Sequence, residues 1–128
     1  MTHNKLQKKV TELLTVRGNG FSMVSSNRRG RPDIAGHIGV ISIFIECKVG
    51  KDTLRPAQRT TLLDINRKKG IGIQLHEKHW DIFEAYVKRI EDEIDKYLPC
   101  NLVGMPIPEE LVVTDHTKVA IAEGFVSI

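Results

Sequence analysis

Apolar residues recur at intervals of three and four in three segments of the chain, which predicts three helices. The first covers residues 4–17. The second covers about residues 56–69, where Pro56 suits a first-turn position and Gly70 suits the stop. In the third, about residues 79–98, the apolar residues are spaced by three and four and form a narrow seam. This seam suits packing on the protein's own sheet or, as a second option, a dimer contact. The seam consists of Trp80, Phe83, Val87, Ile90, Ile94 and Tyr97.

Alternation of apolar and polar residues between these helices predicts strands. Residues 21–25 suit a short strand, and residues 32–49 suit a hairpin whose two strands join near His37 to Gly39. Residues 71–76 alternate again. The elements then follow the order α, β, β, β, α, β, α. This order predicts an α/β fold in which helices flank a central mixed sheet.

The C-terminal part of the chain has a weaker pattern. Residues 99–128 contain proline and glycine, followed by two short apolar runs, "LVVT" (111–114) and "KVAIA" (118–122), which predict short strands. We therefore expect one domain over residues 1–98. The segment 99–128 is then an extension that either belongs to the same domain or makes a dimer contact.

Composition and charge narrow the class of protein. With 128 residues, 41% hydrophobic and 27% charged, the chain suits one compact globular domain without a membrane span. The start lacks the apolar core of a signal peptide, and Cys47 and Cys100 are the only cysteines, so we expect a reduced, cytoplasmic setting. Residues 1–69 hold 14 Lys/Arg against 5 Asp/Glu, whereas residues 70–128 hold 5 against 11. The basic half is expected to attract phosphate-rich partners.

The second strand of the predicted hairpin ends in a pair of charges. In residues 43–49, "IFIECKV", one face is apolar while Glu46 and Lys48 share the other. A register that pairs Asp33 with Phe44 or with Glu46 places Asp33 on that second face, whereas a slip of one residue would bury it without a partner. We therefore expect Asp33, Glu46 and Lys48 to cluster. Two carboxylates held close repel each other, and a hard divalent cation, Mg²⁺ or Mn²⁺, would relieve the repulsion.

Glu46 and Lys48 alone would also suit a plain ion pair on a half-exposed sheet face. The longer pattern is more specific. "GRPDIAGHIGVISIFIECK" has the form G-x-P-D, a hairpin and an apolar strand ending in E-x-K, which resembles the PD-(D/E)xK nuclease superfamily. "KVGKDTLRPAQ" adds a polar loop and a helix with Gln58 in its first turn, and another strand follows "RKKG". Over about residues 4–77 the chain resembles the virus-type replication-repair nuclease (VRR-NUC) family, in particular its small stand-alone phage and bacterial members.

The resemblance implies an αβββαβ nuclease core and a metal-dependent endonuclease that hydrolyses DNA phosphodiester bonds and leaves a 5′-phosphate. By that resemblance, Asp33 and Glu46 would bind Mg²⁺ or Mn²⁺, with the backbone carbonyl of Cys47 completing the ligand set. Lys48 would position the attacking water. Gln58 would steady the site from its helix, on whose buried side the helical spacing independently places it.

The same resemblance implies a structure-selective enzyme that acts on DNA. Four-way junctions, as cut by Holliday junction resolvases, are the expected substrate, with flaps and linear DNA as the alternatives. Two symmetric cuts in a junction would require a twofold homodimer. Basic side chains near the site would hold DNA phosphates without reading the sequence. These are Arg28, Arg29, Arg31, Lys51 and Arg55.

The first helix departs from the family pattern. Related nucleases often carry a glutamate there that reaches the metal. Glu12 is the only glutamate in residues 4–17, and it lies about 140° from the apolar stripe at about 100° per residue. His3 and Gln7 lie nearer the correct edge. The first-helix ligand is therefore either missing, replaced, or supplied by a shifted helix.

Three other interpretations compete with a nuclease. "RRGRP", residues 28–32, matches the core of an AT-hook, which reads the minor groove of A·T-rich DNA, but it runs directly into a predicted strand. His76 and His79, with Cys47 and His37 elsewhere, have a generic spacing for a zinc site. A DNA-binding module without catalysis needs the basic surface but does not need an intact cluster of carboxylates and lysine.

Overall fold

The computed structural model describes residues 1–16, 22–24, 32–39, 41–68, 70–96 and 106–113 of the chain. Its elements confirm the predicted order α, β, β, β, α, β, α, with one 3-10 turn before the last helix. They are α1 (His3–Val16), β1 (Ser22–Val24), β2 (Ile34–Ile38), β3 (Ile41–Lys48), α2 (Pro56–Arg67), β4 (Ile71–His76), the 3-10 helix η1 (Glu77–His79) and α3 (Trp80–Lys96).

The strands form one mixed sheet in the order β1-β2-β3-β4. The first three are antiparallel neighbours, and β4 runs parallel to β3 because α2 carries the chain back between them. Gly39 has a φ of 59° in the tight turn between β2 and β3, a conformation that glycine adopts without steric cost. The hairpin pairs Ile34 with Ile45, so continuing the register by one residue sets Asp33 opposite Glu46. That is one of the two registers expected from the sequence.

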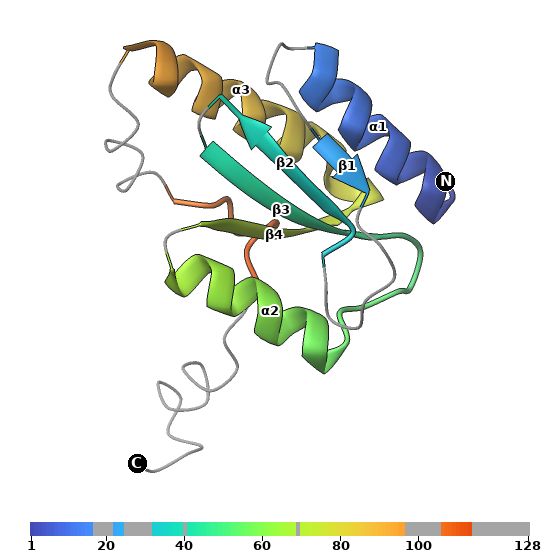
Figure 1. The fold of residues 1–128 in the computed structure, drawn as a ribbon. Coiled ribbons are helices and arrows are strands. Elements are labelled where there is room, and N and C mark those ends of the chain that lie inside the picture. Colours follow the sequence, from blue (N-terminus) through green and yellow to red (C-terminus); the bar gives the residue numbers. More distant parts are fainter. Residues whose placement is uncertain (17–21, 25–31, 40, 69, 97–105, 114–128) are drawn as a thin grey trace, which may run out of the picture.

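The two faces of the sheet are covered differently. Figure 1 shows α1 and α3 over one face and α2 over the other. The larger core lies under α1 and α3, and a smaller one, built on Leu54, Leu62 and Val113, lies under α2. The apolar alternation of β3 thus turns Ile43, Ile45 and Cys47 into the larger core, while residues 44, 46 and 48 face the side of α2.

The apolar seam of α3 is used inside the chain. Phe83, Val87 and Ile90 have no exposed surface and belong to the larger core. The prediction that this seam packs on the protein's own sheet is confirmed. Its alternative use as a dimer contact is wrong for these three side chains, because a buried side chain is not free for a second partner. Within the described residues, no helix is long and apolar enough to cross a bilayer.

β4 forms the edge of the described sheet, and α2 closes part of that edge. The side chain of Asn66 accepts a hydrogen bond from the Gly72 N–H (2.8 Å) and donates one to the Gly72 carbonyl (2.9 Å), as a neighbouring strand would. A Cβ on Gly72 would lie 3.0 Å from the carbonyl oxygen of Leu62. The glycine therefore permits the close approach of helix and strand that brings Asn66 into reach.

The described part of the C-terminal extension, residues 106–113, packs on the same edge. The strand predicted at 111–114 is wrong for residues 111–113, because Leu111 and Val112 donate their N–H groups back to the carbonyl of Pro108 in a turn. The Leu111 side chain is fully buried in the larger core, and its carbonyl accepts a hydrogen bond from the Gln74 N–H (3.0 Å). These apolar residues fill the core instead of extending the sheet. The second predicted strand, at 118–122, lies outside the described residues.

Removing the amide of Asn66 should destabilise the protein. In Asn66→Ala, both backbone groups of Gly72 lose their partners, and we expect the free energy of unfolding in urea to fall by about 1–3 kcal/mol. The matched control on the same helix is Asp64→Ala, which breaks only an exposed ion pair with Lys68 and should cost less than about 0.5 kcal/mol. Equal losses in the two variants would contradict a specific role for Asn66.

Candidate active site

A cluster of charged side chains lies between the sheet and the first turn of α2. β3 supplies Glu46 and Lys48, and Asp33 immediately precedes β2 on the neighbouring strand. Glu46 has 1% of its surface exposed and Lys48 has 7%. The interpretation of these two as a plain ion pair on a half-exposed face is therefore wrong. The loop after β3 and the start of α2 cover this face, which an alternation pattern in β3 alone could not indicate.

The two carboxylates are held by reciprocal hydrogen bonds across the hairpin. The Asp33 N–H donates to Glu46 Oε2 (3.2 Å), and the Cys47 N–H donates to Asp33 Oδ2 (3.0 Å). Each carboxylate thus binds a backbone amide on the opposite strand. The arrangement depends on the register, because a shift of one residue would turn one of the side chains to the other face.

The environment of Glu46 opposes its ionisation. Burial, followed by the negative charge of Asp33, raises the pKa of Glu46 from 4.5 to about 7, although Lys48 acts in the opposite direction. A positive charge placed between Glu46 and Asp33 would stabilise the ionised form of Glu46. Perturbed acids of this kind concentrate at functional sites, which makes the cluster a candidate active site.

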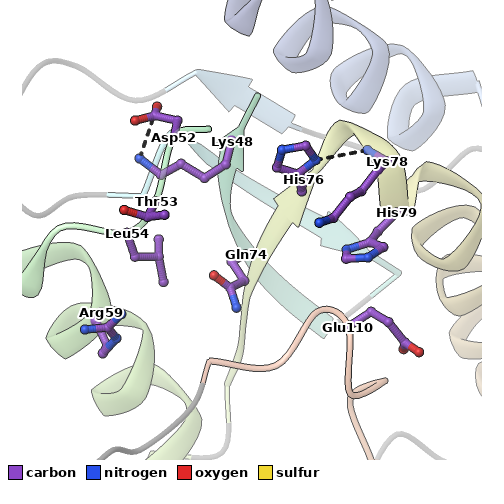
Figure 2. A pocket seen from close by; sticks show the side chains of 10 residues that line it. All are labelled: Lys48, Asp52, Thr53, Leu54, Arg59, Gln74, His76, Lys78, His79 and Glu110. Atoms are coloured by element: carbon purple, nitrogen blue, oxygen red, sulfur yellow. Dashed lines mark hydrogen bonds and ion pairs between the residues drawn. The ribbon is translucent and has the colours of Figure 1, made fainter. Parts of the chain in front are cut away.

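Lys48 lies between two carboxylates. Its Nζ is 3.7 Å from Glu46 Oε1 and 3.7 Å from Asp52 Oδ2, and Figure 2 shows the side chain turned toward Asp52. Asp52 had not been predicted as part of the site. The sequence signal for it is the glycine at position 50, just after β3. Gly50 has a φ of 57°, and the Asp52 N–H donates to the Val49 carbonyl, so the chain turns sharply back toward Lys48.

This turn is fixed from β4 and η1. His76 Nε2 donates to the carbonyl of Gly50 (2.7 Å), and Glu77 Oε1 accepts from the Gly50 N–H (3.3 Å). The other ring nitrogen of His76, Nδ1, accepts from the Lys78 N–H (3.2 Å). His76 therefore links the loop that carries Asp52 to the 3-10 helix, and it acts as a structural residue here.

Gln58 connects α2 to the carboxylates as predicted. Its Nε2 donates to Glu46 Oε1 (2.8 Å), and its Oε1 accepts from the Arg55 N–H (2.9 Å) at the start of the helix. Both ends of the amide are used, so its orientation is determined by its partners. A helix that begins at Pro56 puts Gln58 in the first turn, within reach of the end of β3.

His3 is the residue of the first helix that reaches the site. Its Nε2 lies 3.0 Å from Asp33 Oδ2 and 2.9 Å from the Cys47 carbonyl oxygen. Gln7 supports the ring from one turn further along, with its Nε2 3.3 Å from His3 Nδ1. Glu12 instead points to solvent, where it pairs weakly with Lys8 (3.9 Å). Of the two residues that the sequence placed nearer the correct edge, His3 contacts the site directly and Gln7 contacts His3.

The donor set suits a hard divalent cation. Asp33 and Glu46 are joined by a hydrogen bond from the Asp33 N–H, and the Cys47 carbonyl oxygen and Asp33 Oδ2 both lie within 3.0 Å of His3 Nε2. Mg²⁺ commonly binds one or two carboxylates while keeping several waters. The repulsion that raises the pKa of Glu46 is what such an ion would remove. In the described part of the chain, no three His, Cys, Asp or Glu side chains form a ready metal cluster. An ion here would rest on two carboxylates, a carbonyl and water, while His3 contacts two of those oxygen groups from α1.

The Cys47 side chain takes no part in this chemistry. Its thiol points into the larger core and has no exposed surface, while its backbone faces the site. Burial, followed by the charge of Asp33, raises the pKa of the thiol well above its ordinary value, so the sulfur stays protonated. Only the carbonyl of this residue is available as a ligand.

Other predicted residues fall outside the cluster. Lys51 and Arg55 are exposed on the loop that leads to α2 and on the side of the site. Arg28, Arg29 and Arg31 lie outside the described residues, and with them the AT-hook interpretation. The zinc interpretation is wrong for the described residues: His76 and His79 are 6.4 Å apart between ring centroids, and no metal-binding group includes them.

The structure therefore brings together all five residues that the sequence placed in the site. A scan against protein-family models finds no match for the chain, and a search of curated proteins finds none either. The chemistry of the site has to be derived from the geometry of its own residues. These are Asp33, Glu46, Cys47, Lys48 and Gln58.

The raised pKa of Glu46 should make stability depend on pH. The folded protein keeps a proton on Glu46 that the unfolded chain releases between pH 4.5 and about 7, so the free energy of unfolding falls as pH rises through this interval. In Glu46→Gln that fall should disappear, a gain on the order of 3 kcal/mol at neutral pH. Urea titrations from pH 4 to 8 with chelator measure it. Glu12→Gln, at an exposed position, serves as the control, and parallel curves for wild type and Glu46→Gln would refute the assignment.

Proposed function

We propose that this protein is a divalent-metal-dependent endonuclease that hydrolyses phosphodiester bonds in DNA, built on the PD-(D/E)xK nuclease core and related to VRR-NUC nucleases. One observation carries the proposal. Asp33, Glu46, Lys48 and Gln58 come from three separate elements and meet through direct contacts on one buried face. The motif and spacing in the sequence predict the same four residues.

Stability gives no reason for such a cluster. Burying carboxylates and an ammonium group costs several kcal/mol per ion, and apolar residues of similar size would pack the same space at no such cost. The charge on Lys48 is offset by Glu46 and Asp52, but the repulsion between Glu46 and Asp33 remains. A cluster that is unfavourable without a ligand, at the covered end of a strand, is typical of a catalytic site.

Asp33, Glu46 and the Cys47 carbonyl would hold Mg²⁺ or Mn²⁺, with His3 beside them. When bound, such an ion supplies Lewis-acid stabilisation of charge on the phosphate and makes water more acidic. The residues of the chain do the rest. Gln58 holds one oxygen of Glu46 in place, and the backbone amide of Asp33 holds the other.

Lys48 has the role closest to the reacting atoms. Its ammonium group orients the attacking water and offsets negative charge on the phosphate, while Asp52 and Glu46 keep the long side chain in one position. Water adds to phosphorus as the bond to the 3′ oxygen breaks. The 3′ oxygen leaves as a hydroxyl after taking up a proton, and the phosphate stays on the 5′ end.

DNA fits the charge around this site. The half of the sequence that supplies Asp33, Glu46 and Lys48 holds 14 Lys/Arg against 5 Asp/Glu. Lys51 and Arg55 are exposed on the loop beside the cluster, where they can hold backbone phosphates. Such contacts position the duplex without reading its sequence, which agrees with selection by DNA structure.

Cleavage of DNA should require Lys48 and Glu46, whereas binding of DNA should not. We expect Lys48→Met and Glu46→Gln to lower the rate of cutting of labelled DNA in Mg²⁺ or Mn²⁺ by at least about 100-fold. Lys48→Met removes the ammonium group that acts at the phosphate, and Glu46→Gln removes a carboxylate that would hold the metal ion. Fluorescence anisotropy should show binding within a few-fold of wild type. Lys88→Met, an exposed change on α3, is the control and should cut normally.

Two results would count against the proposal. If wild type binds DNA but cuts none in either metal, the chain is a DNA-binding module and the cluster has another use. If Lys48→Met cuts as fast as wild type, Lys48 does not act at the phosphate.

Structure selectivity and assembly form a separate prediction. On a four-way junction, a resolvase of this kind should make paired symmetric cuts, and the protein should sediment as a homodimer at micromolar concentration. Flap, duplex and single-stranded DNA of the same sequence are the comparison substrates. A monomeric mass together with cutting of flaps or linear DNA alone would keep the nuclease and exclude the resolvase.

A further inference from the structure

A cavity of about 280 Å³ opens directly beside Lys48. Figure 2 shows it between the loop after β3, the first half of α2, the end of β4, η1 and the turn at residues 109–111. Among the side chains that line it are Lys48, Arg59, Gln74, Lys78, His79 and Glu110. None of the roles assigned to the active site accounts for the last five.

Hydrogen bonds hold the walls of the cavity, and none of them uses the guanidinium group of Arg59 or the ammonium group of Lys78. Gln74 forms the floor, where its N–H bonds the Leu111 carbonyl (3.0 Å) and its Nε2 donates to the Val112 carbonyl (3.1 Å). His76 ties the loop on one side to η1 on the other. The hollow is thus a built feature of the fold, and the hydrogen bonds that hold its walls do not involve the side chains of Arg59 or Lys78.

Two cations at the cavity have no acidic partner. Among the described residues, Lys48 is paired with Glu46 and Asp52, but neither the guanidinium group of Arg59 nor the ammonium group of Lys78 forms an ion pair. Figure 2 shows Lys78 directed into the space above Gln74 and Arg59 at the opposite rim. Unpaired cations on both sides of a concave site favour an anionic ligand, and a phosphate group is the one that the neighbouring site would supply.

We propose that the cavity receives one unstacked nucleotide of the strand being cut, next to the phosphodiester that lies at Lys48; this rests on the proposed nuclease function. Arg59 and Lys78, on opposite rims, contact the two phosphates that flank it in the strand. The imidazole of His79 lies against the base, and the Gln74 side chain offers the base edge a hydrogen bond, as aromatic rings and amides do in sites for single-stranded nucleic acid.

This arrangement gives a physical reason for selecting DNA by structure. A nucleotide inside an intact duplex has to leave its stack to enter the cavity, which costs a few kcal/mol, whereas a nucleotide at a junction, flap or single strand is already partly free. Discrimination then comes from the cavity and not from the catalytic cluster. The two contributions can be measured separately.

The first test follows the nucleotide in the absence of cutting. Substrates carry the fluorescent base 2-aminopurine, whose emission rises on unstacking, at each position within two nucleotides of the cut, and chelator prevents cleavage. Wild type should raise the emission several-fold at one position on branched DNA. Arg59→Gln combined with Lys78→Gln should abolish that rise. Lys88→Gln combined with Arg89→Gln, an equal loss of charge on exposed α3 positions, should leave it unchanged.

The second test measures selectivity during cleavage. We expect the Arg59→Gln, Lys78→Gln protein to lose at least ten-fold of the preference of wild type for branched over duplex DNA, while the α3 control keeps it. An abasic nucleotide at the responding position should weaken binding by wild type at least ten-fold, which decides the matter even if the double variant fails to fold.

The outcomes separate this inference from the nuclease itself. No emission change, unaltered selectivity and no effect of the abasic nucleotide would overturn the cavity's role, even where wild type cuts DNA. A localised emission change without any cleavage would support the cavity and refute the nuclease. Retention of the change in Lys48→Met would show that the cavity works independently of the catalytic lysine.

Discussion

The contact between the carboxylates of Asp33 and Glu46 sets the form of this protein. Each one accepts a hydrogen bond from a backbone amide of the other's strand, so the pair exists only in one register of the β2–β3 hairpin. Burial and mutual repulsion make the pair unfavourable alone. The surrounding structure therefore has to supply neutral hydrogen-bond donors and a positive charge, and the residues around the pair do so.

Those features come from every layer of the fold. α2 contributes the amide of Gln58, β3 contributes Lys48, and the turn at Gly50 returns Asp52 to restrain that lysine. From the opposite face, α1 reaches around the end of the sheet to place His3 against Asp33. The larger core under α1 and α3 is plain apolar packing. The larger apolar core and the charged cluster thus lie on opposite faces of one sheet.

The cavity beside Lys48 lies on the same face of the sheet as the charged cluster. It is bounded by the loop after β3, α2, β4 and the first described part of the C-terminal extension. Leu111 anchors that extension in the larger core, while its backbone meets Gln74 at the edge of β4. The extension thereby closes a sheet edge and completes a wall of the hollow, which gives residues 109–113 a structural reason to lie there.

The sequence by itself determined the elements, their order and most of the charged cluster. Alternation in β3 decides which residues share a face, and Pro56 starts α2 so that Gln58 lies in its first turn. A register slipped by one residue would bury Asp33 without a partner, which is too costly. These are local or nearest-neighbour constraints, and one strand or one helical turn is enough to express them.

Only the tertiary structure decided which groups surround the cluster. The burial of Lys48, its pairing with Asp52, the choice of His3 over Glu12 and the use of Leu111 as a core residue all depend on where loops and helix ends pack. Such contacts join residues many positions apart through the geometry of the whole sheet. No period of apolar residues within one segment encodes that geometry, and the cavity with Arg59 and Lys78 exists for the same reason.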